Sequence, residues 1–230
     1  MFVRVAGGHC QAHINNPKVI RGRPFSSHHY IEAAKQLDFK PDRNHDQFNS
    51  DSTRGSMQKD LIFHQNIRGL KGKTEEIMNN IATNLPHVLC FMEHHLESQQ
   101  LDCVPLQSYR LVAKFCRTTY RYGGVCIYVH ESLQASNMEV LKYCKEKDLE
   151  VCSARLYLPT CTIGIVNLYR SPLGNFDYFL KELEILLNLV SRNSRGLIIC
   201  GDFNINFMED TTHKRILNSL LATFGLYPTQ

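Results

Sequence analysis

Two polar side chains stand where an apolar run of this chain ends, in the stretch Ile199-Cys-Gly-Asp-Phe-Asn-Ile205. Because side chains alternate between the two faces of a strand, Asp202 and Asn204 share one face and emerge together. Gly201 has no Cβ, so a ligand or a backbone can approach closely. The stretch predicts a strand that ends in a reactive site. A simple turn is the competing interpretation, since Gly, Asp and Asn are ordinary turn residues.

Polar residues also close three other predicted strands. They are Asn66 in the run Leu61–Ile67, Glu93 in Val88–Glu93 and Tyr169 in Thr162–Tyr169. The carboxyl ends of strands are the usual place for a ligand in an open α/β sheet. One such residue alone is typical of a cap or a solvated turn. Four strands that each end in this way predict a single site built from carboxylate, amide and phenol groups.

These side-chain types suit the hydrolysis of a phosphate ester. Mg²⁺ takes one or two carboxylates and keeps several waters, which leaves room for phosphate oxygens, and Glu93 is the expected ligand. Asp202 is expected to orient or deprotonate the attacking water, and Asn204 to hold its geometry. Tyr169 is expected to donate a hydrogen bond to the phosphate.

The elements that would position these residues alternate between short strands and amphipathic helices, which predicts an α/β fold. The predicted strands are 61–67, 88–93, 125–130, 151–158, 162–169 and 197–204. Pro159-Thr160 joins two of them as a turn, which predicts a meander. The predicted helices are 74–85, one whose N-cap is Asn175, and 211–224. The last helix is expected to turn Ile216, Leu217, Leu220, Leu221 and Phe224 inward.

Composition limits the class of protein. Hydrophobic residues make up 43% and charged residues 21% of the 230 residues, as in a globular domain, and the net charge of +4 suits a polyanionic partner without requiring one. The nine cysteines form no Cys-x-x-Cys pair, and several lie in apolar runs, as small buried hydrophobes do. The chain opens without a signal peptide and has no run of the roughly 18 apolar residues that a membrane span needs. We therefore expect an intracellular protein of the nucleus or cytoplasm, without a membrane partner.

The sequence divides near residue 60. Residues 1–59 are polar and turn-rich, and Asp42–Gly55 holds one aromatic and no aliphatic residue, which predicts a disordered leader or linker. Its basic residues could touch nucleic acid, but a spacer or a non-native leader is the favoured interpretation. Residues 60–230 are expected to form the folded domain.

Five motifs in this order resemble the endonuclease/exonuclease/phosphatase superfamily. They are QNIRGL with Asn66, CFMEHHL with Glu93, GGVCIYV, IVNLYRSP with Tyr169, and CGDFN with Asp202 and Asn204. The Glu-His-His-Leu and Asn-Leu-Tyr-Arg-Ser-Pro segments resemble those of the apurinic-endonuclease-like domain of non-LTR (LINE-type) retrotransposons. The resemblance covers about residues 60–230. It implies a four-layer α/β sandwich, in which two packed mixed β-sheets are flanked by helices.

The resemblance also implies roles for the residues. Asn66 and Glu93 belong to the metal site, for Mg²⁺ with Mn²⁺ as a substitute. Tyr169 contacts the phosphate, Asp202 positions or activates water, and Asn204 supports Asp202. The implied activity is a Mg²⁺-dependent endonuclease that hydrolyses phosphodiester bonds and nicks target DNA, so DNA is the expected partner.

The end of the chain departs from the superfamily pattern. Members continue past the segment equivalent to Pro228-Thr229 into strands that carry a Ser/Thr-x-Ile-Asp stretch and a terminal Ser-Asp-His. We therefore expect a domain that is truncated at its C-terminus and whose activity is impaired, because the missing His would bind the scissile phosphate. Such a loss costs about 10² to 10⁴ in rate. His64, His94 and His95 lie near enough in sequence to be considered as replacements, although bystander roles are favoured for them.

Two alternatives stay open beside the endonuclease. A phosphatase or sphingomyelinase-like phosphodiesterase of the same superfamily would keep Glu93 and Asp202 but act on a small molecule or lipid. A non-catalytic relic would bind nucleic acid or protein without turnover. Faster cleavage of plasmid DNA than of nitrophenyl phosphate esters would favour the endonuclease over the small-molecule phosphodiesterase. Any turnover that depends on Asp202 would exclude the non-catalytic relic.

Overall fold

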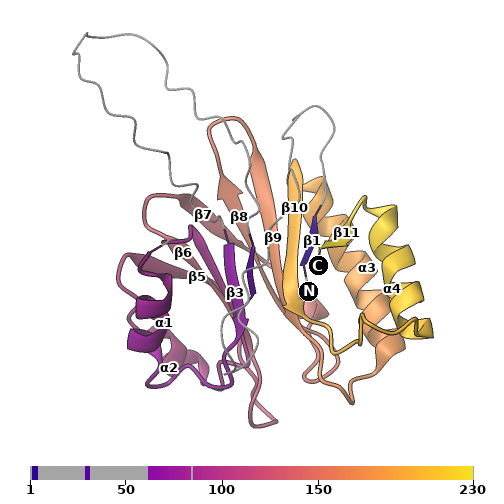
Figure 1. Ribbon diagram of the computed structural model, residues 1–230, viewed down its shortest axis with the longest axis horizontal. Helices are drawn as coiled ribbons and strands as arrows, with labels where there is room; N and C mark the ends of the chain where they lie inside the picture. Colours follow the sequence, from indigo (N-terminus) through magenta and orange to yellow (C-terminus); the bar gives the residue numbers. More distant parts are fainter. Residues whose placement is uncertain (1, 5–28, 32–61, 84, 230) are drawn as a thin grey trace.

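The apolar runs of the sequence form two β-sheets in a computed structural model, which describes residues 2–4, 29–31, 62–83 and 85–229. The sheets pack face to face, and helices cover their outer faces (Figure 1). Each sheet contains parallel and antiparallel pairs. The predicted four-layer α/β sandwich is therefore confirmed. The predicted leader comprises residues 1–59. The structure describes only two strands of it, Phe2–Arg4 and His29–Ile31, and the rest lies outside the described residues.

One sheet has six strands in the order β11-β1-β10-β9-β8-β7. Their bounds are β1 (Phe2–Arg4), β7 (Gln134–Met138), β8 (Glu150–Tyr157), β9 (Thr162–Tyr169), β10 (Gly196–Asp202) and β11 (Tyr227–Thr229). β8 and β9 form the predicted meander, since they pair antiparallel. β9 and β10 run parallel, with Tyr169 opposite Asp202. Two residues of the predicted site therefore lie side by side at one end of this sheet.

The other sheet has five strands in the order β2-β3-β4-β6-β5. Their bounds are β2 (His29–Ile31), β3 (Ile62–Asn66), β4 (Val88–Met92), β5 (Tyr109–Phe115) and β6 (Val125–His130). β3 and β4 run parallel, with Asn66 opposite Met92. Glu93 follows Met92 directly, so Asn66 and Glu93 also leave neighbouring strands at the same end.

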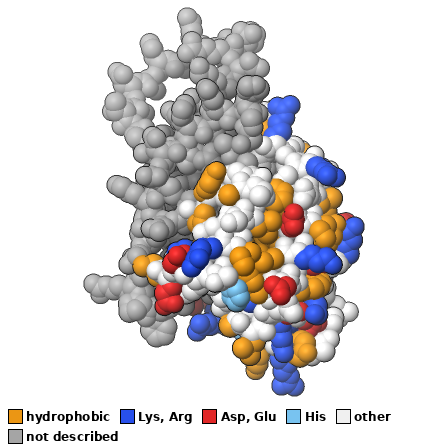
Figure 2. Space-filling view, turned by 90° about the vertical axis from the view of Figure 1, so that its right-hand side faces the viewer, with side chains coloured by type: hydrophobic (Ala, Val, Ile, Leu, Met, Phe, Trp, Pro, Cys, Tyr) orange, Lys and Arg blue, Asp and Glu red, His pale blue; other side chains and the backbone are white. Residues whose placement is uncertain are grey.

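Helices form the two outer layers. They are α1 (Thr74–Ile81) and α2 (Ser98–Asp102) on the five-stranded sheet, α3 (Phe176–Arg192) and α4 (Thr212–Thr223) on the six-stranded sheet, and the short 3-10 helix η1 (Leu141–Tyr143). Asn175 caps α3 as predicted, because its side chain accepts a hydrogen bond from the Tyr178 N–H. Figure 2 shows the α3–α4 side of the molecule, where charged side chains of both signs are interspersed with apolar ones.

The core between the sheets is apolar. It includes Cys90, Cys152 and Cys200, whereas Cys126 lies on the opposite face of its strand, in the core beneath α1 and α2. All four are at most 1% exposed, so the prediction of cysteines as small buried hydrophobes holds for them. All eight cysteines among the described residues are free thiols. A close-packed layer of this kind holds the two sheets, and therefore their ends, in a fixed relation.

Three local predictions need correction. The first helix ends at Ile81 rather than Leu85, because the chain must turn before β4 begins at Val88. In α4, Leu217 and Leu221 are buried, but Ile216 lies off their stripe and is 44% exposed. The strand predicted to reach Asn204 ends at Asp202.

In the part of the chain that the structure describes, no helix has the length and apolar character needed to cross a membrane.

Candidate active site

Residues from both sheets meet where the parallel strand pairs end. The Asn66 amide nitrogen donates to Glu93 Oε1 at 2.8 Å and to Asp202 Oδ2 at 3.2 Å. Asn66 and Glu93 belong to the five-stranded sheet and Asp202 to the six-stranded sheet. One amide group therefore links two carboxylates across the interface between the sheets, which is the central contact of the site.

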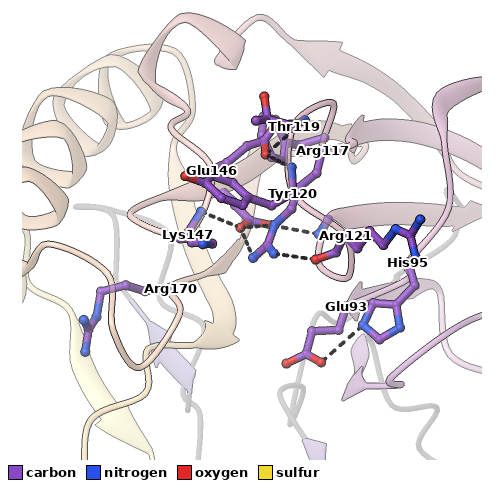
Figure 3. A network of polar contacts seen from close by, with 12 residues as sticks. Glu93, His95, Arg117, Thr119, Tyr120, Arg121, Glu146, Lys147 and Arg170 are labelled. Carbon is purple, nitrogen blue, oxygen red and sulfur yellow. Dashed lines mark hydrogen bonds and ion pairs between the residues drawn. The ribbon is translucent and has the colours of Figure 1, made fainter.

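A tight turn aims the Glu93 carboxylate. Glu93 has a φ of 54°, in the left-handed region that a side chain other than Gly rarely adopts. The turn is fixed by its backbone, because the Gly69 N–H donates to the Glu93 carbonyl at 2.7 Å and the His95 N–H to the Gly123 carbonyl at 2.9 Å. His95 Nε2 lies 3.4 Å from Glu93 Oε2 (Figure 3). Burial lowers the pKa of His95 although Glu93 opposes the shift, so the ring is neutral at pH 7.

A second tight turn holds Asp202. The Asn204 N–H donates to Asp202 Oδ1 at 3.1 Å, and Asn204 has a φ of 49°. The Asn204 side chain points back and donates to the Arg170 carbonyl at 2.6 Å. Both Asp202 oxygens therefore accept a hydrogen bond from the chain, one from Asn204 and one from Asn66, which fixes the direction of the carboxylate.

Tyr169 completes the group from the neighbouring strand. The residue is 7% exposed, and burial raises the pKa of its hydroxyl, with Glu93 and Asp202 adding to the shift. The phenol is protonated at neutral pH and can act as a donor. The Arg117 guanidinium carbon lies 5.9 Å from the centre of the Tyr169 ring. All five residues that the sequence singled out thus lie in or beside one hydrogen-bonded group.

The donor atoms of this group fit a hard divalent cation. Among the described residues no cluster of three or more His, Cys, Asp or Glu side chains is arranged to hold a metal. Mg²⁺ needs no such cluster, because it binds through one or two carboxylates and keeps its remaining waters. Glu93 would supply one such carboxylate, and the Asn66 side-chain amide oxygen would be the second protein ligand. Asn66 Oδ1 of the side-chain amide accepts from the Arg68 N–H at 3.3 Å, so it would have to turn from that contact to act as a ligand.

The histidines considered as replacements differ in placement. His94 is fully buried, with Nε2 3.0 Å from the Phe115 carbonyl and Nδ1 accepting from the Leu96 N–H. Burial lowers its pKa to about 4, so it is a neutral structural group whose ring nitrogens are both engaged. His64 is 5% exposed within β3. His95 touches a site residue, Glu93.

Sequence reasoning missed several buried polar residues around the site. Glu150 is fully buried and pairs with Arg117 at 2.5 Å, and it also accepts from the Gly124 N–H at 2.7 Å. Nearby, the Glu146 carboxylate accepts from three successive N–H groups, those of Thr118, Thr119 and Tyr120 (Figure 3). These contacts join residues 26 to 33 positions apart, so no local pattern indicates them. A charged residue at the start of an apolar strand, as at Glu150, is the one available signal.

Comparisons with known proteins identify the family and the fold. A model of the Endonuclease/Exonuclease/phosphatase family matches residues 63–229. The endonuclease domain of TRAS1, a telomere-specific non-LTR retrotransposon, is similar in structure, with a TM-score of 0.55 and 15% identity over 71% of this chain and 70% of that one. D. rerio TDP2 in complex with a single-strand DNA product has a TM-score of 0.47 and 15% identity, over 71% and 64% of the chains.

An AP endonuclease from Archaeoglobus fulgidus has a TM-score of 0.46 and 19% identity, over 70% of this chain and 64% of its own. No curated protein matches the chain in sequence. At these identities, the structural likeness concerns the fold, and the family is given by the match to residues 63–229.

Proposed function

Because the chain belongs to the endonuclease/exonuclease/phosphatase family, we propose that it is a Mg²⁺-dependent DNA endonuclease domain of retrotransposon type, which hydrolyses phosphodiester bonds to nick target DNA. The observation that carries the proposal is the Asn66 amide bridging Glu93 and Asp202 across the two sheets. The sequence motifs around Glu93 and Tyr169 support the retrotransposon type, as does the similarity of fold to the TRAS1 domain.

Each residue of the candidate site has a separate role in the proposed hydrolysis. Glu93 and Asn66 would hold Mg²⁺, and Mn²⁺ is the expected substitute. The bound ion supplies positive charge against the phosphate oxygens. Asp202 accepts a proton from the attacking water, and its two hydrogen bonds hold it in direction for that transfer. Tyr169 donates to the phosphate. The water oxygen bonds to phosphorus as the bond to the leaving oxygen breaks, and that oxygen takes up a proton from solvent to become the 3′-hydroxyl of the nick.

A basic and aromatic loop beside the site favours DNA over a small phosphate ester. Tyr120 and Tyr122 are 48% and 68% exposed, and Arg121 lies between them. The Lys147 ammonium lies 3.4 Å from the centre of the Tyr120 ring, and the Tyr122 ring packs edge-on against His95 at 5.0 Å. Exposed rings and cations next to the reacting group suit bases and backbone phosphates.

The proposal is tested by nicking of supercoiled plasmid. We expect Mg²⁺-dependent conversion to the open circle, reduced at least about 100-fold in Asp202→Ala. The matched control is Asp102→Ala, which removes an exposed carboxylate of α2 that pairs with Lys114 at 2.5 Å and should keep activity. Circular dichroism on each sample establishes folding.

Two other outcomes would replace the proposal. Faster Asp202-dependent hydrolysis of nitrophenyl phosphate esters than of DNA would identify the small-molecule phosphodiesterase. A folded chain that binds DNA equally with and without Asp202 and turns over no substrate with Mg²⁺ or Mn²⁺ would identify the non-catalytic binder.

A further inference from the structure

Arg170 follows Tyr169 directly, and its side chain reaches the turn that carries Asp202 and Asn204. Its guanidinium donates to three backbone carbonyls, from Nε to Phe203 at 3.0 Å, from one terminal nitrogen to Asn204 at 3.0 Å, and from the other to Gly174 at 2.8 Å. Two of these three carbonyls belong to the residues that immediately follow Asp202.

The backbone of Arg170 binds the same turn. Its N–H donates to the Asp202 carbonyl at 3.0 Å, and its carbonyl accepts from the Asn204 side-chain amide at 2.6 Å. Each residue from Asp202 to Asn204 therefore contacts Arg170. Asn204 is in the left-handed region, and such a conformation persists where its surroundings determine it.

The surroundings of Arg170 leave its side chain no freedom. The residue is 4% exposed, and its guanidinium carbon lies 5.6 Å and 5.8 Å from the ring centres of Phe176 and Phe179 on α3. Buried cations are normally paired with an anion, whereas this one is bonded mainly to carbonyls. A planar guanidinium with five N–H groups can serve three carbonyls at once, which a lysine ammonium at the same place cannot do with the same geometry.

We infer that Arg170 is a positioning residue for the reaction, which fixes the Asp202–Asn204 turn and through it the direction of the Asp202 carboxylate. The inference rests on the proposed function, since it concerns the residue expected to accept the proton of the attacking water. Arg170 does not touch the reacting atoms. Its contribution is preorganisation, because small displacements of a reacting group cost large factors in rate.

The first test compares Arg170→Lys with wild type in the full chain, using a labelled DNA duplex and excess Mg²⁺. We expect kcat to fall about 100-fold while KM changes by less than about threefold, because substrate contacts remain while proton transfer loses alignment. Arg110→Lys is the matched control: Arg110 also donates to two carbonyls, those of Leu133 and Ala135 at 3.1 and 3.2 Å, at the other end of the five-stranded sheet. It should keep kcat.

A second variant separates positioning from general stability. In Arg170→Ala, guanidinium chloride at tens of millimolar should raise kcat at least about tenfold, because the free guanidinium ion fills the vacated space with the same planar donor. Ethylammonium at equal concentration should not restore it, nor should guanidinium rescue Asp202→Ala. Loss of activity in step with the fraction unfolded, without rescue, would overturn the inference.

Hydrogen exchange gives a readout that does not need activity. We expect faster amide exchange in the segment 203–207 of Arg170→Lys and unchanged exchange within β10. If wild type does not nick DNA, but segment 203–207 exchanges faster in Arg170→Lys than in wild type, the proposed function fails and the positioning of the turn by Arg170 stands. If kcat and the exchange of segment 203–207 both match wild type in folded Arg170→Lys, Arg170 does not position the turn.

Discussion

At the scale of single residues, the Asn66 amide decides whether two carboxylates can face one phosphate. It donates to both Glu93 and Asp202, and without it their negative charges would face each other with no shared donor. We expect Asn66→Ala to lower kcat about 10²- to 10³-fold, the usual cost of removing one preorganised donor. Nicking rates measured across a Mg²⁺ titration check this.

Asn137→Ala is the control for Asn66→Ala. Asn137 also donates to a glutamate, Glu139, at 2.7 Å, but on the exposed edge strand β7. The variant should nick at the wild-type rate. A similar loss in both variants, or a rate for Asn66→Ala within about twofold of wild type, would mean that the bridge between the carboxylates has no part in the reaction.

The site residues differ in how far sequence could identify them. Asn66, Tyr169 and Asp202 each close an apolar run, so the alternation of strand side chains predicts that they emerge at one edge. Arg170 could not be found in that way. Its partners lie 33 and 34 positions later, and an arginine after a strand normally indicates a solvated turn.

At the scale of elements, the Glu146 carboxylate anchors the first part of the loop from Thr118 to Tyr122. Burial alone would raise the pKa of Glu146, but the N–H groups of residues 118–120 bind the charged form and lower it below its ordinary value. We expect Glu146→Gln to loosen the loop and raise KM for DNA about tenfold, with kcat little changed, because stacking rings lose their placement.

The sign of the pH dependence follows from the lowered pKa. The stabilisation by Glu146 is complete above the unfolded value of about 4.5 and is lost as pH falls through the lower folded value. Wild type should therefore melt above Glu146→Gln at pH 7, and the gap in Tm should narrow as the pH falls below about 4.5. A gap that stays constant to pH 3 would show that the charge of Glu146 does not hold the loop.

Two residues after this loop lies Gly124, a glycine that the fold requires. A Cβ on Gly124 would lie 2.3 Å from His94 Nε2 and 2.9 Å from the Phe115 carbonyl, at a φ of +84°. We expect Gly124→Ala to lower the free energy of unfolding by about 3 kcal/mol, since strain and a clash combine. Gly72→Ala isolates the strain, because Gly72 has a φ of +76° and open space around it, and should cost about 1 kcal/mol. Urea unfolding of both variants measures the difference, and equal losses would contradict the clash.

Elements were predictable where their own residues carry the signal. The strands Val125–His130 and Thr162–Tyr169 were predicted with the bounds that the structure gives, because both are rich in apolar and β-branched residues. β7 has the sequence QASNM, with one buried residue, and exists as a strand through its pairing with β8. Such an edge strand has no hydrophobic pattern of its own to detect.

At the scale of the whole molecule, the site exists only while the two sheets keep their alignment, since each supplies one carboxylate. Asn167 on β9 lies fully buried between them, and its amide nitrogen donates to the Phe91 carbonyl at 2.9 Å and the Cys126 carbonyl at 3.0 Å in the opposite sheet. It is thus a second polar link across a largely apolar interface, in the same strand as Tyr169 and two residues before it.

We expect Asn167→Leu to reduce the free energy of unfolding by about 3 kcal/mol, because it removes two fully buried hydrogen bonds between the sheets. Ser153→Ala is the control: Ser153 is equally buried but donates to Ile165 within its own sheet at 2.9 Å, and should cost about 1 kcal/mol. If the link aligns the sheets, folded Asn167→Leu also loses nicking activity, since Glu93 and Asp202 separate, whereas folded Ser153→Ala keeps it. Full activity in folded Asn167→Leu would show that apolar packing alone holds the two halves of the site in register.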